Sequence, residues 1–282
     1  MPKITVIIVN WNVTKLLQAC LTSLRRQTDC SLQIIVVDNA SADDSVKMIR
    51  DEFPEIDLIT NQTNRGFATA NNQGLRQAKS DYILFLNPDT IVPAGSVNTM
   101  AKALETDSQT AIIAPKILNS DDSVQPSIRR DPTAFNQALV LLKLINIFPW
   151  LPGLRSYLQR SFDYDQQQIV EQVKGAAFMM RRETLEKIGG WDEDFFLWFE
   201  EVDLCLRTRQ SGKHIVYYPK AQITHYGGAS FEQTYTRRKQ KLFNDSLLHY
   251  ADKHFSSSQK VLLYLVWPIN VSLTFVWSLF KK

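Results

Sequence analysis

The chain has 282 residues, of which 44% are hydrophobic and 22% charged, a balance typical of globular proteins and not of disordered ones. Its formal net charge of +3 is too small to predict a nucleic-acid-binding protein. Cys20, Cys30 and Cys205 are scattered and lack metal-ligand spacing, which predicts free thiols in a reducing compartment and neither a disulfide framework nor a zinc site. No signal peptide is expected at the start of the chain.

The first 118 residues alternate between strand and helix patterns. Apolar, β-branched runs predict strands, and apolar residues at three- or four-residue spacing predict helices. Strands are expected at residues 3–9, 32–37, 56–59, 82–86 and 110–115, with helices at 13–27, 41–52 (with Ser41 as N-cap), 66–78 and 96–105. This alternation predicts an α/β fold with a mostly parallel sheet and helices on both faces.

The rest of the chain divides into three further parts. Regularity fades over residues 119–172, which hold several prolines and are expected to cover or flank the sheet. Order returns over residues 173–255, with a strand at 173–181, helices at 182–188 and from about Glu200, and a strand at 221–224. Residues 256–282 form an apolar tail.

The tail predicts contact with a membrane. Val261 to Phe280 carries no charged residue and is long enough to cross a bilayer core of about 30 Å. Pro268 and Asn270 weaken a spanning interpretation, while Trp267 suits a membrane interface. The alternatives are a helix that spans, one that lies on the surface, and a terminal helix pair buried in the core. A second apolar stretch, residues 138–153, fits either core or a hairpin that dips into lipid.

Polar side chains follow three of the predicted strands. Asn10 and Asn12 follow the first, Asp38 the second, and "NPD" (Asn87 to Asp89) the fourth. In a parallel sheet these ends share the edge where ligands bind and helices begin, which suits a diphosphate. A divalent cation bound by Asp89 would offset the repulsion between this carboxylate and a phosphate, because such cations take oxygen ligands from both.

The second half supplies acid–base candidates. Glu200 and Glu201 follow four aromatic residues within "DFFLWFEE". Acids at a helix start are common for dipole reasons, but an apolar setting also raises the pKa of a carboxyl and makes it a general base. His225 follows a predicted strand and precedes two glycines, so it is either structural or a nitrogen ligand of the metal. The basic residues at 237–241 are either a solvated face or a contact for diphosphate or anionic lipid.

Several signatures are absent. There is no G-x-G-x-x-G, no P-loop and no G-x-S-x-G, which excludes the common dinucleotide, P-loop and hydrolase fingerprints. A nucleotidyltransferase remains an alternative, although it would need a glycine-rich loop near the first strand. A non-catalytic membrane-bound scaffold is a second alternative, although the acidic candidates are all present.

These motifs, in this order, resemble the family 2 glycosyltransferases of GT-A fold, especially bacterial rhamnosyltransferase-like members. The resemblance rests on "VIIVNWN", "IIVVDNASADDS", "NRGFATANNQG", "FLNPDT", "VKGAAFMMRRETLEKIGGWDEDFFLWFEEVDLCLR" and "ITHYGGAS" and covers roughly residues 4–255. It implies a nucleotide-sugar-binding half at 1–118, an acceptor-side insertion at 119–172, an acceptor-binding and catalytic half at 173–255, and a membrane-associating tail at 256–282.

The resemblance also implies roles for individual residues. Donor binding falls to Asn10, Asn12, Asp38, Arg65, Gly66, Asn87, Gly175 and Ala176, the metal to Asp89 and His225, catalysis to Glu201 and Glu200, and the acceptor side to Trp191, Asp192 and Asp203. Asn87 replaces the first aspartate of the family's D-x-D motif, and Glu201 replaces the usual catalytic aspartate. Which of Glu200 and Glu201 is the base stays open.

The implied reaction is an inverting, metal-dependent transfer. A sugar, with rhamnose favoured, would pass from a nucleoside-diphosphate donor to a glycan or lipid-linked acceptor, with Mg²⁺ or Mn²⁺ as cofactor. The resemblance implies a role in cell-surface polysaccharide synthesis and a cytoplasmic enzyme attached to the inner face of the cell membrane.

Overall fold

The structure, a computed structural model, describes residues 1–227 and 236–280. It is built on one large sheet, with a small two-stranded sheet beside it. The end of the "ITHYGGAS" motif (residues 228–230) and the two terminal lysines lie outside the described residues.

One half of the sheet is parallel, as the alternating pattern predicts. Its strands, in spatial order, are β3 (Asp57–Thr60), β2 (Ser31–Asp38), β1 (Lys3–Asn10) and β4 (Tyr82–Leu86). Asn10 pairs in register with Asp38, so the polar ends of the two strands lie side by side. All four strands were expected within a residue or two of their observed bounds.

The other half of the sheet is mixed, so the expectation of a mostly parallel sheet is wrong there. Strand β10 (Ala177–Arg181) lies antiparallel between β4 and β6 (Thr110–Leu118), and β6 runs parallel to β11 (His214–His225). The short strands β5 (Thr90–Ile91) and β8 (Gln168–Ile169) pair antiparallel with β11. The strand–helix alternation that predicts parallel pairing ends after β6, and the short strands β8 and β9 (Gln172–Val173), with no helix after them, lead into β10.

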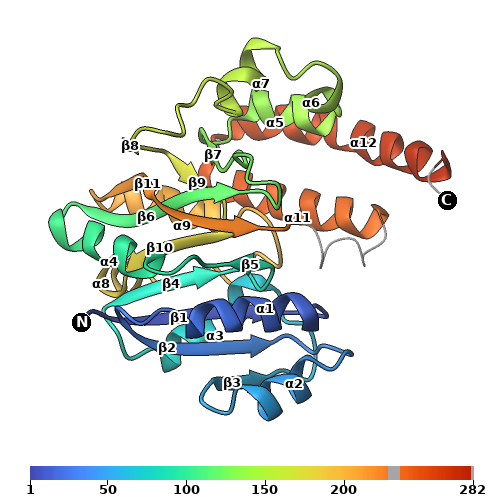
Figure 1. Cartoon of the computed structure of the whole chain (residues 1–282). Helices are drawn as coiled ribbons and strands as arrows, with labels where there is room; N and C mark the ends of the chain where they lie inside the picture. Colours follow the sequence, from blue (N-terminus) through green and yellow to red (C-terminus); the bar gives the residue numbers. More distant parts are fainter. Residues whose placement is uncertain (228–235, 281–282) are drawn as a thin grey trace.

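Helices cover both faces of the sheet, as expected (Figure 1). Alternate side chains of β1 divide between the two faces. Ile4, Val6 and Ile8 pack with one set of helices and Ile7 with another, as the period-two geometry of a strand requires. The first set is α1 (Thr14–Arg25), α2 (Ser45–Glu52) and α4 (Ser96–Thr106), and the second is α3 (Phe67–Gln77), α8 (Arg182–Lys187) and α9 (Glu200–Gln210).

Ser41 is not the N-cap of α2, because the helix starts later and Asp44 precedes it. The Ser41 hydroxyl instead accepts hydrogen bonds from Asn10 Nδ2 at 3.1 Å and the Asn12 backbone N–H at 3.0 Å. It therefore ties the ends of the first two strands together.

Residues 119–172 are more regular than expected. They contain β7 (Ile128–Arg129), α5 (Ala134–Leu141), α6 (Leu144–Ile147), α7 (Pro152–Tyr157) and β8, and β9 (Gln172–Val173) begins at their end. Thr133 and Asn136 form a capping box at the start of α5, and Pro152 occupies the first turn of α7, where its missing N–H costs nothing. The prolines that suggested irregular chain thus mark helix starts as well as loops.

The C-terminal helices form a layer with α5 (Figure 1). Helices α11 (Thr236–His254) and α12 (Ser257–Phe280) contact each other, and α12 also contacts α5. Leu141, Val202, Leu247 and Leu263 share a buried cluster that joins this layer to α9. Among residues 1–227 and 236–280, no helix combines the length and apolar character needed to cross a membrane.

A buried polar contact connects the three helices of this layer. Asn270 of α12 is fully buried. It accepts a hydrogen bond from Asn244 Nδ2 of α11 at 3.0 Å, and its own Nδ2 donates to the Leu141 carbonyl oxygen of α5 at 2.6 Å. Since buried polar groups are costly unless paired, this residue fixes how the apolar tail packs.

Replacing Asn270 tests that role. In Asn270→Leu, the Asn244 amide and the Leu141 carbonyl lose their partner, and we expect unfolding free energy to fall by about 1–3 kcal/mol. Urea unfolding measures it. The neighbouring Ile269→Asn, at a half-exposed position, is the control and should change stability by less than about 0.5 kcal/mol. Equal stability of Asn270→Leu and wild type would contradict the assignment.

Candidate active site

A cavity of about 330 Å³ opens at the carboxyl edge of the parallel strands. The segment that follows β4, the segment that precedes β10, the start of α9 and the end of β11 all contribute to its wall. Eight sequence-predicted site residues line it together: Gly66, Asn87, Asp89, Gly175, Ala176, Glu200, Glu201 and His225. The structure therefore brings the expected metal and catalytic residues and four of the eight expected donor-binding residues to one space.

Asn10, Asn12 and Asp38 lie behind this cavity and do not line it. Asn10 Nδ2 donates to Asp38 Oδ1 at 2.8 Å, and Asp38 Oδ2 accepts the Ser41 N–H at 3.0 Å. The buried Asn10 Oδ1 has no hydrogen-bond partner among the described residues. As placed, these side chains brace the strand ends, whereas Trp11 and Asn39, their neighbours in sequence, reach the wall.

The turn at Gly66 is fixed by close backbone packing. Its φ of +85° is in the left-handed region, and a Cβ there would lie 2.7 Å from the Phe196 carbonyl oxygen, so only glycine fits. Phe67 N–H donates to that same oxygen at 2.8 Å. This contact joins the expected donor-binding turn to the loop before Glu200. The side chain of Arg65, the preceding predicted residue, is exposed and outside the lining.

The two glutamates stand at the first turn of α9. Trp198 and Phe199, directly before them, both have φ of 67°, a left-handed conformation that is strained for large side chains. Phe199 is held there by packing against Phe243 and Tyr250. The strained pair turns the chain sharply, so that Glu200 and Glu201 both face the cavity.

Burial raises the pKa of both carboxyl groups. Desolvation and the charge of Glu201 raise the pKa of Glu200 well above its ordinary value. Burial also raises the pKa of Glu201, opposed by backbone hydrogen bonds and the positive charge of Arg129. The Oε2 atoms of both residues are buried without a hydrogen-bond partner in the part of the chain that the structure describes. Two residues that line a cavity and carry unpartnered carboxyl oxygens are suited to a proton transfer with a ligand.

Asp89 and His225 fit a divalent cation. Asp89 Oδ1 lies 3.3 Å from His225 Nε2, and Asn87 Nδ2 lies 3.5 Å from that nitrogen. Neighbouring ligands of an octahedral ion with bonds of about 2.1 Å are about 3 Å apart, close to the observed oxygen–nitrogen separation. Asn87 brings an amide and no second carboxylate, as its sequence indicates.

The three residues expected on the acceptor side do not line the cavity. Trp191 is buried against Phe67, Phe85 and Phe178. Asp203 is fully buried and pairs with Arg207 at 2.7 Å, Lys253 at 2.8 Å and His254 at 2.7 Å. Their placement indicates packing and helix anchoring, since α11 supplies two of these partners.

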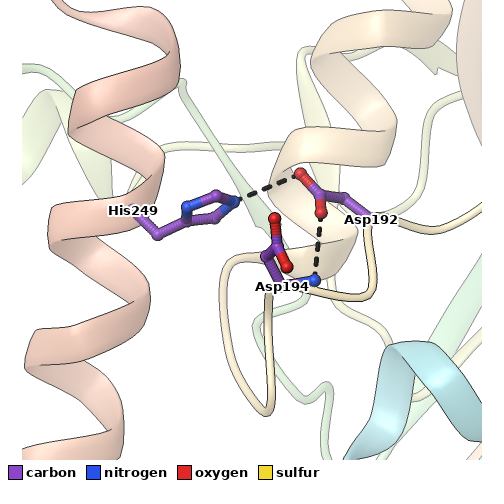
Figure 2. A group of neighbouring side chains, drawn as sticks. All are labelled: Asp192, Asp194 and His249. Atoms are coloured by element: carbon purple, nitrogen blue, oxygen red, sulfur yellow. Dashed lines mark hydrogen bonds and ion pairs between the residues drawn. The ribbon is translucent and has the colours of Figure 1, made fainter.

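Asp192 belongs to a second group of ligand-type side chains, with Asp194 and His249 (Figure 2). Their ligand atoms lie within 4.8 Å of one another, but Asp192 Oδ2 already contacts Lys253 Nζ at 2.6 Å and His249 Nε2 at 3.2 Å. Although burial opposes it, hydrogen bonds from Lys253, the Asp194 backbone and His249 hold the pKa of Asp192 at about 2. An ammonium therefore supplies the counter-charge, and the group fastens the loop to α11.

Sequence reasoning missed several side chains of the wall. Lys174, Phe196 and Trp198 line it. All three stand inside quoted motifs, beside residues that were selected. Arg238 also lines the cavity, and it belongs to the basic residues at 237–241 that the sequence offered as either a solvated face or a contact for diphosphate or anionic lipid. The sequence could have indicated these side chains only through their position beside a motif residue. The fold is needed to show which neighbour of a motif residue faces the cavity.

Comparison with known proteins identifies the class to which this fold and site belong. The model of glycosyl transferase family 2 matches residues 5–189, more than half of the chain, and the model of glycosyl transferase family group 2 matches residues 158–281. The chain belongs to glycosyl transferase family 2. It is thus a glycosyltransferase, a class for which a sugar-nucleotide donor fits, and this assignment favours it over the nucleotidyltransferase and scaffold alternatives.

Individual relatives agree with this assignment. The chain is 25% identical over 260 residues to N-acetylglucosaminyl-diphospho-decaprenol L-rhamnosyltransferase of Mycobacterium tuberculosis, covering 88% of this chain and 84% of the relative. This confirms the rhamnosyltransferase-like resemblance.

Solved structures share the fold at low identity. The mannosyltransferase PcManGT from Pyrobaculum calidifontis, in complex with GDP-Man and Mn²⁺, matches with a TM-score of 0.60 at 16% identity, over 100% of this chain and 76% of that one. GalNAc-T7 with UDP, GalNAc and Mn²⁺ matches with a TM-score of 0.59 at 15% identity, over 80% of this chain, which spans only 44% of that protein. The likeness agrees with the expected GT-A type of α/β fold.

The raised pKa of Glu200 has a consequence for stability. An acid whose pKa is higher in the folded than in the unfolded chain binds more protons when folded, so stability falls as pH rises above about 4.3 towards the folded-state pKa. Glu200→Gln removes that loss. We expect it to be more stable than wild type in urea unfolding at pH 8, by a margin that shrinks towards pH 4.5.

Glu105→Gln, at an exposed position of α4, is the matched control and should show no comparable change with pH. A stability difference between Glu200→Gln and wild type that is constant from pH 4.5 to pH 8 would show that Glu200 ionises normally in the folded chain.

Proposed function

We propose that this protein is an inverting, divalent-cation-dependent glycosyltransferase that moves a sugar from a nucleoside-diphosphate donor to a hydroxyl of a glycan or lipid-linked acceptor. The observation that carries the proposal is the shared cavity, in which the carboxyl groups of Glu200 and Glu201 face the same space as Asp89 and His225. A base and an anion-binding site around one space are what a single displacement at an anomeric carbon requires.

Glu201 is the proposed base. Backbone N–H groups and the charge of Arg129 favour the ionised form of Glu201, whereas burial and the charge of Glu201 raise the pKa of Glu200 well above its ordinary value. Glu201 accepts the proton of the acceptor hydroxyl as that oxygen attacks the anomeric carbon. The bond to the diphosphate oxygen breaks on the opposite face, so the configuration inverts and no covalent enzyme intermediate forms.

Asp89 and His225 would hold Mg²⁺ or Mn²⁺. When bound, such a cation supplies positive charge against the diphosphate leaving group. The chain itself adds Lys174 and Arg238, two cationic side chains of the cavity wall. Gly175 and Ala176 line the wall beside Lys174, and a close approach of substrate to this backbone is expected there.

The donor and acceptor classes follow the mycobacterial relative. That protein is named as an L-rhamnosyltransferase acting on N-acetylglucosaminyl-diphospho-decaprenol. By this likeness we favour a rhamnose donor, a lipid-linked acceptor and a role in cell-surface polysaccharide synthesis. Residues 1–118 would then bind the nucleotide sugar, and residues 119–172 and 173–255 the acceptor.

Attachment to a membrane surface fits the exposed apolar side chains of the C-terminal layer. Leu265 of α12 and Trp150 of the segment after α6 are each more than half exposed. Arg237 of α11 lies over the Phe275 ring of α12, 4.6 Å from its centroid, so positive charge stands beside this apolar surface. Apolar residues flanked by cations are typical of helices that lie in the interface of anionic bilayers. A cytoplasmic enzyme on the inner face of the membrane would use the surface in this way.

The assignment of Glu201 as the base predicts that its loss lowers turnover without changing nucleotide binding. Glu201→Gln removes the base, so we expect release of nucleoside diphosphate from a panel of dTDP-, UDP- and GDP-sugars, with acceptor, to fall by about 10²–10⁴-fold. Calorimetric titration of dTDP, UDP and GDP should show unchanged affinity in this variant. Asp89→Ala should instead weaken the Mn²⁺-dependent binding.

Glu200→Gln is the matched control, with a smaller loss of turnover because it keeps a neutral group. Near-normal transfer by Glu201→Gln would refute the role of Glu201. Absence of nucleotide binding with either Mg²⁺ or Mn²⁺ would refute the proposed donor site.

Membrane attachment is tested with the full chain and lipid vesicles. We expect cosedimentation with vesicles that contain phosphatidylglycerol. It should be reduced at least several-fold in the double variant Trp150→Ser, Leu265→Ser, because two exposed apolar side chains proposed to enter the bilayer interface are lost. Ile169→Ser, which removes an equally exposed apolar side chain from β8, is the control. Equal binding by the double variant and Ile169→Ser would rule out this surface.

A further inference from the structure

Gln125 contacts two residues of the cavity wall without lining the cavity itself. Its Oε1 accepts a hydrogen bond from Lys174 Nζ at 2.7 Å and lies 2.7 Å from His225 Nδ1. Its Nε2 donates to Asn119 Oδ1 at 2.8 Å and to the His225 carbonyl oxygen at 3.2 Å. One partly buried amide thus bridges two side chains of the candidate site.

These contacts determine which end of the amide faces which partner. A lysine ammonium has only donors, so the group that meets Lys174 must be the amide oxygen. At the other end of the amide lie Asn119 Oδ1 and the His225 carbonyl oxygen. Both are acceptors, so the amide nitrogen must face them. Because Oε1 is an acceptor, His225 Nδ1 must carry the hydrogen in the contact between them.

This tautomer decides what His225 offers to the cavity. A neutral imidazole with hydrogen on Nδ1 has its lone pair on Nε2, the atom 3.3 Å from Asp89 Oδ1. The opposite tautomer, which predominates for free histidine in water, would present an N–H there and could not bind a cation. The hydrogen bond that orients a ligand ring through its other nitrogen is a recurring feature of metal sites.

We propose that Gln125 is a positioning residue, which fixes His225 in the Nδ1–H tautomer with Nε2 directed at Asp89 and anchors the ammonium of Lys174 beside it. The role towards a cation rests on the proposed function, whereas the tautomer is a property of the metal-free chain. No sequence motif points to Gln125, which stands in the expected acceptor-side insertion at 119–172.

The tautomer can be measured without metal. ¹⁵N-histidine NMR of chelator-treated protein at pH 8.5 resolves protonated from unprotonated ring nitrogens, and His225→Gln identifies the resonances of His225 among the four histidines. We expect Nδ1 protonated in wild type and a shift to the Nε2–H form in Gln125→Leu and Gln125→Met. Lys174→Met is the control, because the acceptors of Gln125 Nε2 remain and the tautomer should persist.

Titration of Mn²⁺ alone, followed by loss of the free-ion EPR signal, gives the second readout. We expect Gln125→Leu and Gln125→Met to bind Mn²⁺ about 10–100-fold more weakly than wild type, with Asp89→Ala as the reference for a lost ligand. Wild-type tautomer and wild-type Mn²⁺ affinity in both Gln125 variants would overturn the inference and leave the proposed function standing. Absence of Mn²⁺ binding by the wild type would overturn the cation site and the role of Gln125 towards it.

Discussion

The antiparallel entry of β10 between β4 and β6 is the constraint on which the site depends. A strand that runs against β4 must start where β4 ends, so Gly175 and Ala176 meet Asn87, and Asn87 N–H donates to the Ala176 carbonyl oxygen at 2.9 Å. The same edge receives the end of β11 with His225, through its pairing with Thr90. Residues far apart in the sequence therefore meet because of strand direction, and the edge of the parallel strands becomes the wall of a cavity.

The fold keeps Glu200 and Glu201 adjacent and buried, although this arrangement disfavours ionisation of their carboxyl groups. Two adjacent carboxyl groups in a buried setting disfavour each other's ionised form, and the strained backbone at Trp198 and Phe199 adds a further cost. The aromatic packing behind Phe199 and the ion pairs of Asp203 with Arg207, Lys253 and His254 stabilise the start of α9 from the opposite side. These contacts stabilise the start of α9 on the side away from the cavity and leave the buried carboxyl groups of the residues that line it available to a ligand.

The sequence predicted the parallel half of the fold because each strand and helix there follows a local period. It placed Asp89, His225 and the two glutamates near one another, where they line one cavity, because strand ends and motif order point to one edge; their roles stay predictions. It did not predict the sheet reversal, the helices of residues 119–172, the inward face of Lys174 or the contacts that Gln125 makes with Lys174 and His225, since these depend on contacts across many positions. Asn10 and Asp38 were selected for their polarity, which the structure uses to pair the strand ends with each other. A polar strand end thus indicates the edge of a site, but burial decides which side chains reach it.

The C-terminal layer and residues 119–172 form one hydrophobic unit. Leu141 of α5, Leu263 of α12 and Val202 of α9 share a buried cluster, and Asn270 fastens α12 to both α5 and α11. Helix α11 in turn holds the loop before α9 through Lys253, which contacts both Asp192 and Asp203. The apolar tail is therefore tied by side-chain contacts to the helix that carries Glu201. A surface that docks this layer on lipid would fix the orientation of the cavity relative to the bilayer, which is the geometry that a lipid-linked acceptor needs.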